Sequence, residues 1–344
     1  MFRNSLEQAR SLVIYYDAVA PLISGASSAD SGIVTKEEYP LDTRSAPILV
    51  FDVGGSHIAA SVFDSQSSSI GAIRDQHLPS GAEPETFFKT FESLVATVLP
   101  ATATPHGISI AIPSPFDYEH GISEMRHKFQ SLYGMDLRRE LSPRFGCPPD
   151  CIHFLNDASA SLIGELHQVG ASGARRAIGI TLGTGVGAAF AVDGNVVVEG
   201  PGVPAGGEIW NQPYRDGIVE DYVSTPAIQR TFEELTGKRL QVCEIASAAS
   251  HRQEAQQAFE KFGRELGSVL RRISAAFVPD RIVLGGGIAR AADYFLAAAK
   301  AELGDFRDRL YVSELSERAP LIGAGISWLN RKAAVSAPMK REEA

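Results

Sequence analysis

The sequence predicts a duplicated α/β protein, and two glycine-rich hairpins carry that prediction. Residues 48–63 read as an apolar strand, a turn over residues 52–57 and a return strand. About 130 residues later, residues 177–192 repeat this design around a turn over residues 183–187. Short apolar runs bounded by glycine turns are typical of buried strands. Each half of the chain therefore opens with a hairpin whose glycine tip lets backbone N–H groups approach an anion.

The rest of the first half alternates between helix and strand, which favours an α/β architecture. The pattern predicts a helix over residues 85–99 and a strand over residues 107–112. A second strand over residues 151–155 and a helix over residues 158–169 follow.

The second half continues in the same way. Asp193-Gly194 predicts a two-residue turn, because this dipeptide accepts positive φ angles, and a strand follows over residues 195–198. Residues 252–277 carry large apolar side chains at three- and four-residue steps, which indicates a long helix that Pro279 stops. We then expect a strand over 281–284, a turn over 285–287 and helices over 288–303 and 320–330.

The composition is that of a globular chain and excludes several classes of function. The 344 residues predict about two domains. The net charge of −9, with no basic run, argues against nucleic acid as the main ligand. No apolar stretch approaches the ~20 residues of a membrane helix, and the 3 cysteines cannot build a disulfide framework. We therefore expect a cytoplasmic protein without a membrane segment.

Residues 1–46 differ in composition from the rest of the chain. They predict a helix over residues 5–20, ended by Pro21, and then an irregular linker over residues 24–47 that is rich in small residues. We assign this extension no function.

The glycine turns and the aspartate beside them could hold a nucleotide. Two such turns facing each other would bind phosphates, although each alone could be a tight hairpin turn. Asp52 ends a buried strand beside Gly54-Gly55, where a carboxylate can hold Mg²⁺ through water. The alternative for Asp52 is a turn-capping role.

Four polar residues further along the chain could contact a substrate that carries hydroxyl groups. Asp157 could accept the proton of an attacking hydroxyl, and Asn156 could bind a neighbouring hydroxyl. Asn and Asp are also favoured at helix N-caps, which is the structural alternative for this pair. Glu208 and Glu220 stand in glycine-containing loops, where they could bind sugar hydroxyls or simply be solvated.

Two further patterns are less specific. Residues 183–188 fit the dinucleotide-binding fingerprint formally, but that fingerprint needs a helix where this sequence predicts a strand. Cys147, Cys151 and His153 are metal-ligand types, but no second pair follows, so we expect a structural role for them.

Five motifs follow one another between residues 48 and 330. They are Phe51-Asp52-Val53-Gly54-Gly55-Ser56, Leu155-Asn156-Asp157-Ala158, Leu182-Gly183-Thr184-Gly185-Val186-Gly187, Gly207-Glu208 and Ile282-Val283-Leu284-Gly285-Gly286-Gly287. In this order the chain resembles the ROK family of sugar kinases and related repressors, within the hexokinase–actin–Hsp70 ATPase superfamily. The resemblance implies two duplicated ribonuclease-H-like (actin-like ATPase) lobes around a central cleft. The implied boundaries are an extension over 1–46, lobes over 47–155 and 156–319, and a C-terminal helix and tail over 320–344 that pack back on the first lobe.

The resemblance also implies a reaction and its residues. It implies transfer of the γ-phosphoryl group of Mg-ATP to a hydroxyl, often the 6-hydroxyl, of a hexose or N-acetylhexosamine, as in a glucokinase. Asp157 matches the catalytic base. The implied sugar contacts are Asn156, Asp157, Glu208, Glu220 and Ser114, the last standing where the family usually has glycine. The implied nucleotide contacts are Asp52 (which also holds Mg²⁺ through water), Gly54, Gly55, Ser56, Gly183, Thr184, Gly185, Gly285, Gly286 and Gly287. A homodimer is compatible with the family.

The chain departs from the family after Gly207-Glu208. The family usually has a hydrophobic residue, glycine and a histidine that binds sugar and zinc, whereas Ile209-Trp210-Asn211 stands here. The cysteine-rich zinc loop is also missing between residues 211 and 217, so we expect no structural zinc. The identity of the sugar is left open.

Two alternatives to an ATP-dependent kinase remain at this point. One is a polyphosphate-dependent glucokinase, for which Arg126, Lys128, Arg138 and Arg139 are candidate donor contacts. The other is a non-catalytic sugar-binding ROK regulator, which the retention of Asp157 and of both glycine loops disfavours.

Overall fold

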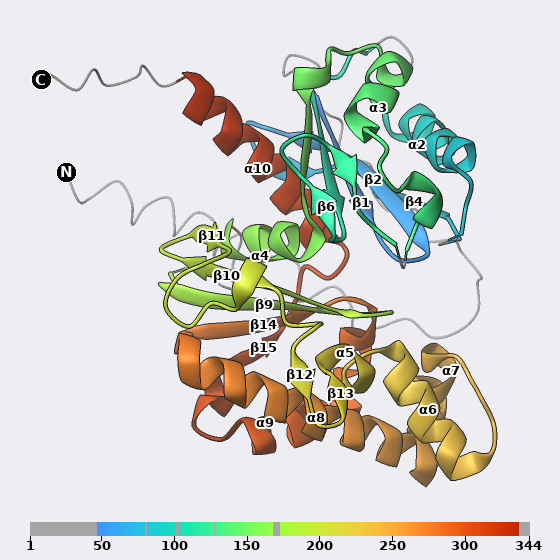
Figure 1. The fold of residues 1–344 in the computed structure, drawn as a ribbon, viewed down its shortest axis with the longest axis vertical. Helices are drawn as coiled ribbons and strands as arrows, with labels where there is room; N and C mark the ends of the chain where they lie inside the picture. Colours follow the sequence, from blue (N-terminus) through green and yellow to red (C-terminus); the bar gives the residue numbers. More distant parts are fainter. Residues whose placement is uncertain (1–46, 80, 101–102, 127, 168–172, 337–344) are drawn as a thin grey trace, which may run out of the picture. The chain divides into compact units, whose positions relative to one another are not determined.

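Two β-sheets with the same strand order organise the chain (Figure 1). The structure is a computed structural model, which describes residues 47–79, 81–100, 103–126, 128–167 and 173–336. The predicted helix over residues 5–20 and almost all of the predicted linker lie outside these residues. No described helix has both the length and the apolar character needed to span a membrane.

The first sheet has the order β3-β2-β1-β5-β8, with β4 also paired to β2. β1 runs antiparallel to β2 and parallel to β5, and β5 runs parallel to β8. The strands are β1 (Ile48–Val53), β2 (His57–Asp64), β3 (Ser69–Ile70), β4 (Arg74–His77), β5 (Gly107–Ile112) and β8 (Ile152–Asn156).

The second sheet repeats this arrangement in the order β11-β10-β9-β14-β15. β9 runs antiparallel to β10 and parallel to β14, and β14 runs parallel to β15. Its strands are β9 (Arg176–Leu182), β10 (Val186–Val192), β11 (Asn195–Val197), β14 (Arg281–Gly285) and β15 (Leu310–Val312). The duplication predicted from the hairpins is thus present in the topology, and the β1–β2 and β9–β10 turns occupy corresponding places.

Helices cover both faces of the first sheet, which explains why its central strands are apolar on both sides. Helices α2 (Pro84–Val98) and α3 (Leu137–Phe145) share a core with Leu49 and Phe51 of β1. Helix α10 (Arg318–Ser336) shares a core with Ile48 and Val50, the alternate residues of the same strand.

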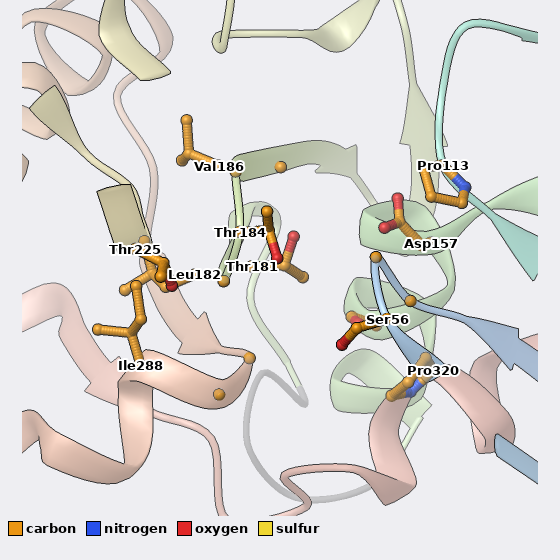
Figure 2. Close-up of a pocket in the computed structure, with 18 of the residues that line it drawn as sticks. Ser56, Pro113, Asp157, Thr181, Leu182, Thr184, Val186, Thr225, Ile288 and Pro320 are labelled. Carbon is orange, nitrogen blue, oxygen red and sulfur yellow. The ribbon is translucent and has the colours of Figure 1, made fainter. Parts of the chain in front are cut away.

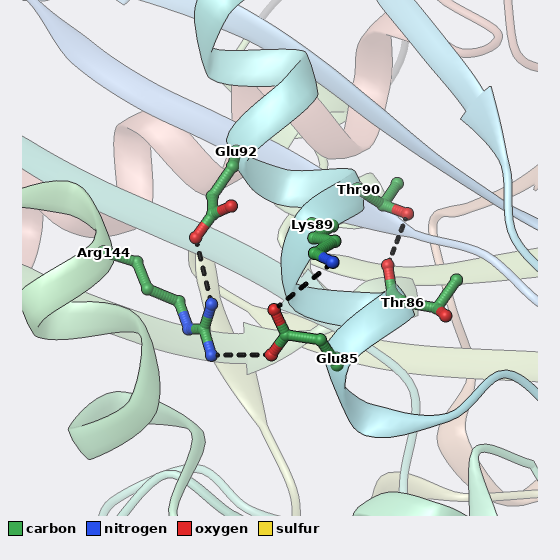
Figure 3. Close-up of polar contacts among 6 residues, drawn as sticks. All are labelled: Glu85, Thr86, Lys89, Thr90, Glu92 and Arg144. Atoms are coloured by element: carbon green, nitrogen blue, oxygen red, sulfur yellow. Dashed lines mark hydrogen bonds and ion pairs between the residues drawn. The ribbon is translucent and has the colours of Figure 1, made fainter.

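A polar contact joins the two helices on the outer face (Figure 3). Arg144 of α3 donates to Glu92 and to Glu85 of α2, both at 3.0 Å. Its guanidinium also lies over the Phe88 ring, 4.8 Å from the ring centre. Arg144 therefore fixes α3 against α2 with charge and with the flat face of its side chain.

The second sheet is covered in the same two-sided way. One face packs on a large core that includes α6 (Thr225–Thr236), α7 (Val242–Ala248), α8 (Gln253–Phe277) and α9 (Leu296–Leu303). The other face packs on α4 (Asp157–His167) through small side chains of β9 and β10. Figure 1 shows α8 and α9 on the side of this sheet away from α4. The apolar stripe of the predicted long helix is buried, as its spacing indicates.

Helices α4 and α10 cross at glycines. A Cβ atom on Gly164 would overlap the carbonyl oxygen of Ala319, and one on Gly323 would overlap that of Ala160. The two helices thus touch backbone to backbone. Because α4 packs on the second sheet and α10 on the first, this crossing couples the two halves of the chain.

One predicted helix differs in kind. Residues 288–303 are not one α-helix: a 3₁₀ segment over Gly287–Tyr294 is followed at Phe295 by α9. Ala291 has φ −100° and ψ 20° inside the 3₁₀ segment, and Ile288 and Ala292 are buried. Ile288 and Ala291, three residues apart, both belong to the core of the second sheet, which matches the three-residue turn of a 3₁₀ helix.

The remaining short elements are connections. They are β6 (Phe116–Asp117), β7 (Ile122–Ser123), β12 (Pro213–Tyr214), β13 (Gly217–Ile218) and α5 (Val219–Tyr222), with 3₁₀ turns over Gln130–Leu132, Pro149–Cys151, Ala205–Gly207 and Gly304–Arg309. Asp193 and Gly194 have φ values of 49° and 82°, which confirms the predicted two-residue turn.

Candidate functional site

A cavity of about 700 Å³ brings together residues from both halves of the chain. The predicted base, sugar contacts and nucleotide contacts all line it except Gly285, which lies just before the lining residues Gly286 and Gly287. In Figure 2, Asp157, Pro113 and Ser56 lie on one side of the cavity, and Thr184, Leu182 and Val186 lie across from them. The cavity therefore places the two glycine loops near the predicted base.

The two aspartates owe their place to the ends of parallel strands. Asp52 is near the end of β1, and Asp157 directly follows β8 as the first residue of α4. Burial, together with the negative charge of Asp157, raises the pKa of Asp52 to about 7. Burial also raises the pKa of Asp157, and the positive charge of Lys128 opposes that rise. Two carboxylates that line one cavity and interact electrostatically favour binding of a proton or a cation.

Asn156 is held in one orientation by two partners. Its Oδ1 accepts a hydrogen bond from the Ser159 N–H at 3.0 Å, so it caps α4 as its residue type suggests. Its Nδ2 donates to the Tyr118 hydroxyl at 3.2 Å, and this hydroxyl donates to the Ile112 carbonyl at 3.1 Å. Capping therefore does not compete with a binding role, because it directs one amide N–H toward Tyr118 and leaves a second donor on the same nitrogen.

The two glycine loops both line the cavity and approach each other closely. A Cβ atom on Gly55 would lie 3.2 Å from Oγ1 of Thr184. Gly54 N–H bonds the His57 carbonyl at 2.9 Å, and Gly183 N–H bonds the Gly185 carbonyl at 3.0 Å. The loops are thus closed by their own backbone and approach to within side-chain contact of each other.

Glu220 supports the second loop. Its Oε2 accepts a hydrogen bond from the Val186 N–H at 3.0 Å, and a Cβ atom on Gly185 would overlap the same carboxylate. Glu220 lines the cavity, as expected of a sugar contact, but one of its oxygens already holds the loop.

Trp210 meets Glu208 at the cavity wall. Its indole Nε1 donates to Oε2 of Glu208 at 2.8 Å, and both residues line the cavity. Trp210 is half-buried, whereas Asn211 is exposed and is not among the lining residues. The departure from the family therefore puts an indole N–H in contact with one of the candidate sugar-binding carboxylates.

The opposite end of the cavity is largely apolar. Thr225 and Ile288 lie well apart from Asp157 in Figure 2. Val242, Ala246 and Ala291 complete this end. Gly286, with φ 85°, is needed here because a Cβ atom would lie 2.6 Å from the Leu182 N atom.

Sequence reasoning missed the helix α7 residues at this end and weighed Lys128 only as a surface residue or a polyphosphate contact. Lys128 lines the cavity, whereas Arg126, Arg138 and Arg139 do not. Arg126 lies 4.2 Å from the centre of the Tyr133 ring, and Arg138 donates to the Glu119 carbonyl. No local pattern distinguishes Lys128 from the three arginines.

The cavity offers limited means of holding a metal ion. Within the described ranges, no group of three or more His, Cys, Asp or Glu side chains could hold one. His153 instead bonds the Ser327 hydroxyl at 2.9 Å, and Cys147 is buried in the first core. Burial raises the pKa of the Asp52 carboxylate, which lines the cavity beside the first glycine loop. A cation such as Mg²⁺, which takes few protein ligands and otherwise water and phosphate, would offset the cost of burying that charge.

Comparison with known proteins agrees with this geometry. The sequence profile of the ROK family matches residues 48–330. The chain is 23% identical over 304 residues to a glucokinase of Thermotoga maritima, covering 79% of this chain and 94% of that protein. It is 26% identical over 303 residues to an N-acetylmannosamine kinase of Escherichia coli, covering 83% and 99%.

A solved structure shares the fold. It is a ROK family glucokinase from Streptomyces griseus in complex with glucose and AMPPNP, with a TM-score of 0.69 at 21% identity, and the match covers 82% of this chain and 98% of that one. The profile match extends over most of the chain and includes both sheets and every lining residue of the cavity. The chain therefore belongs to the ROK family.

Proposed function

We propose that this chain is an ATP-dependent sugar kinase that transfers the γ-phosphoryl group to the 6-hydroxyl of a hexose or N-acetylhexosamine. The observation that carries the proposal is the position of Asp157, which shares one cavity with two opposed glycine loops. Family membership and the kinase names of its relatives identify the chain as a phosphotransferase with an alcohol acceptor.

Asp157 acts as the base in this mechanism. Its carboxylate takes the proton of the attacking hydroxyl as the bond to phosphorus forms. Burial raises its pKa, which makes it a stronger base than a solvated aspartate while Lys128 helps to keep it ionised. Asn156, with its amide fixed by Tyr118 and by the helix start, orients a neighbouring hydroxyl.

Backbone N–H groups and a cation would stabilise the negative charge of the phosphates. The N–H groups of the two loops bind phosphate oxygens, and their geometry is preformed by internal hydrogen bonds. Asp52 is the residue that would hold Mg²⁺, through water. Mg²⁺ held there would supply positive charge against the negative charge that develops on the phosphates during transfer.

The apolar end of the cavity supports a nucleotide donor. Val242, Ala246 and Ile288 offer a slot for an adenine ring, which inorganic polyphosphate lacks. Three of the four basic residues that could have contacted polyphosphate do not line the cavity. ATP is therefore the donor that the geometry favours.

The test is ADP release from Mg-ATP with glucose, mannose, N-acetylglucosamine, N-acetylmannosamine and N-acetylgalactosamine, for the wild type and for Asp157→Asn. We expect ADP release with at least one sugar and a loss of about 10²–10⁴-fold in kcat for the variant, because asparagine keeps the shape and removes the base. The variant should still bind the sugar, measured by calorimetry. Near-normal turnover of Asp157→Asn would contradict the assignment of the base. Sugar phosphorylation from polyphosphate alone would contradict ATP as donor, and sugar binding without turnover from either donor would favour the regulator.

A further inference from the structure

Lys128 is placed in the cavity by a firmly anchored segment. Met125 and Phe129, on either side of it, are fully buried in the core of the first sheet. The Phe129 ring lies 5.6 Å from that of Phe87 in helix α2. Phe129 also has φ 45°, a left-handed conformation that costs a bulky residue energy. Packing of Met125 and Phe129 therefore fixes the backbone on both sides of Lys128, including the left-handed conformation of Phe129. A lysine on a solvated surface loop would not need such anchoring.

The charge of Lys128 is uncompensated by direct contacts. Within the described residues, it makes no hydrogen bond and no ion pair. The other long cationic side chain that lines the cavity, Arg290, pairs with Glu317 at 2.9 Å. Lys128 is near enough to Asp157 to act on it electrostatically, yet the two do not form an ion pair. A long flexible ammonium beside a buried carboxylate is thus available to a ligand.

Phosphoryl transfer would bring a negatively charged group, the phosphoryl group itself, close to Lys128 and Asp157. The acceptor sugars in question are neutral, so they offer Lys128 no charge in the ground state. The moving phosphoryl group spreads negative charge over three oxygens and passes between the loops and the hydroxyl that Asp157 faces. Apart from Glu317, which pairs with Arg290, the carboxylates that line the cavity are Asp52, Asp157, Glu208 and Glu220, and they would repel this group.

We propose that the Lys128 ammonium binds the phosphoryl group as it arrives on the acceptor, and then the phosphate of the product. This assignment rests on the proposed kinase function. It makes Lys128 a catalytic residue that favours the transition state over the neutral sugar, so its removal should lower kcat more than it raises KM for the sugar.

The test compares Lys128→Met and Lys128→Arg with Arg126→Met as the matched control. Arg126 belongs to the same segment but contacts Tyr133 and does not line the cavity. Calorimetry measures binding of glucose, N-acetylglucosamine and N-acetylmannosamine, each beside its own 6-phosphate. Turnover of the sugar with the best ADP release is measured in parallel.

We expect Lys128→Met to weaken binding of the 6-phosphate about 10- to 100-fold, the size of a charge-assisted hydrogen bond, and to change binding of the neutral sugar less than about 3-fold. Its kcat should fall by at least about 10-fold with little change in KM for the sugar. Lys128→Arg should retain part of both effects, and Arg126→Met should behave as wild type.

Three results would overturn this inference, and they separate it from the proposed function. Equal losses for sugar and 6-phosphate would make Lys128 a contact to the sugar itself. Unchanged binding of the 6-phosphate would remove the contact altogether. In both cases sugar-dependent ADP release by the wild type would leave the kinase intact. A wild-type protein that binds none of these sugars or phosphates would overturn both proposals together.

Discussion

The crossing of α4 and α10 predicts that replacing a helical glycine with alanine destabilises the protein, which is opposite to the usual effect in a helix. Gly323→Ala replaces glycine with the best helix former, which by itself stabilises a helix by about 1 kcal/mol. Here the new Cβ would overlap the Ala160 carbonyl oxygen and lie 2.7 Å from its carbonyl carbon and 2.8 Å from the Gly164 N atom. Ordinary contacts begin at 3.4 Å, so the helices must separate.

The magnitude follows from what can move. All three atoms belong to the backbone of α4, so no side-chain rotation relieves the overlap. Overpacking of a core costs about 1–3 kcal/mol, and we take about 3 here. Subtracting the helix propensity leaves a net loss of about 2 kcal/mol, which corresponds to a fall of about 4–8 °C in Tm for a domain of ~200 residues.

Thermal unfolding measured by calorimetry checks this value, with Gly81→Ala as control. A Cβ atom on Gly81 meets nothing within 4 Å, so its Tm should stay within about 1 °C of wild type. Because α4 begins at Asp157, Gly323→Ala should also lower kcat. A variant as stable as wild type, or more stable, would refute the argument that backbone contact at this crossing outweighs helix propensity.

Three further predictions concern separate contacts. Gly185→Ala should raise KM for ATP about 10-fold with little effect on Tm, because the methyl group displaces Glu220 and breaks its bond to the loop; an unchanged KM would argue against that support. Arg144→Ala should lower the free energy of unfolding, measured in urea, by about 1 kcal/mol, and by less at high salt. Lys89→Ala should cause no measurable loss, because its ion pair with Glu85 is exposed and 3.9 Å long. Equal losses for the two variants would contradict this prediction. Burial lowers the pKa of His153 from 6.5 to about 4. As pH falls from 6.5 towards 4, the unfolded chain therefore binds a proton at this histidine that the folded chain does not, and Tm falls. His153→Gln should make that fall of Tm with pH less steep, and an unchanged slope would assign the pH dependence to other groups.

Features that depend on local rules could be predicted from the sequence. The glycine hairpins, the Asp193-Gly194 turn and the long amphipathic helix each follow from the conformational range of glycine or from residue spacing. The duplication could be predicted because each half of the chain opens with the same pattern, two apolar strands joined by a glycine-rich turn. Most residues proposed for the site line one cavity. They could be selected from the sequence because many of them stand at strand ends, where glycine and aspartate are conspicuous.

Features set by long-range packing could not be predicted. The 3₁₀ segment after β14 places Ile288 and Ala291, three residues apart, in the core, and the sequence pattern alone does not distinguish this segment from an α-helix. Lys128 reaches the cavity through two buried neighbours and a left-handed Phe129. The bond from Val186 to Glu220 joins residues 34 positions apart. In each case the deciding partner is distant in the chain.

The position of α10 constrains the order in which the protein can mature on the ribosome. One face of the first sheet, with Ile48 and Val50, is buried by Leu321 and Ile322. Those helix residues are translated about 160 residues after β8, the last strand of that sheet. At about 5–20 residues per second, the sheet waits roughly 10–30 s with an apolar face uncovered. The nascent first half is therefore a natural client for a chaperone until α10 emerges and docks.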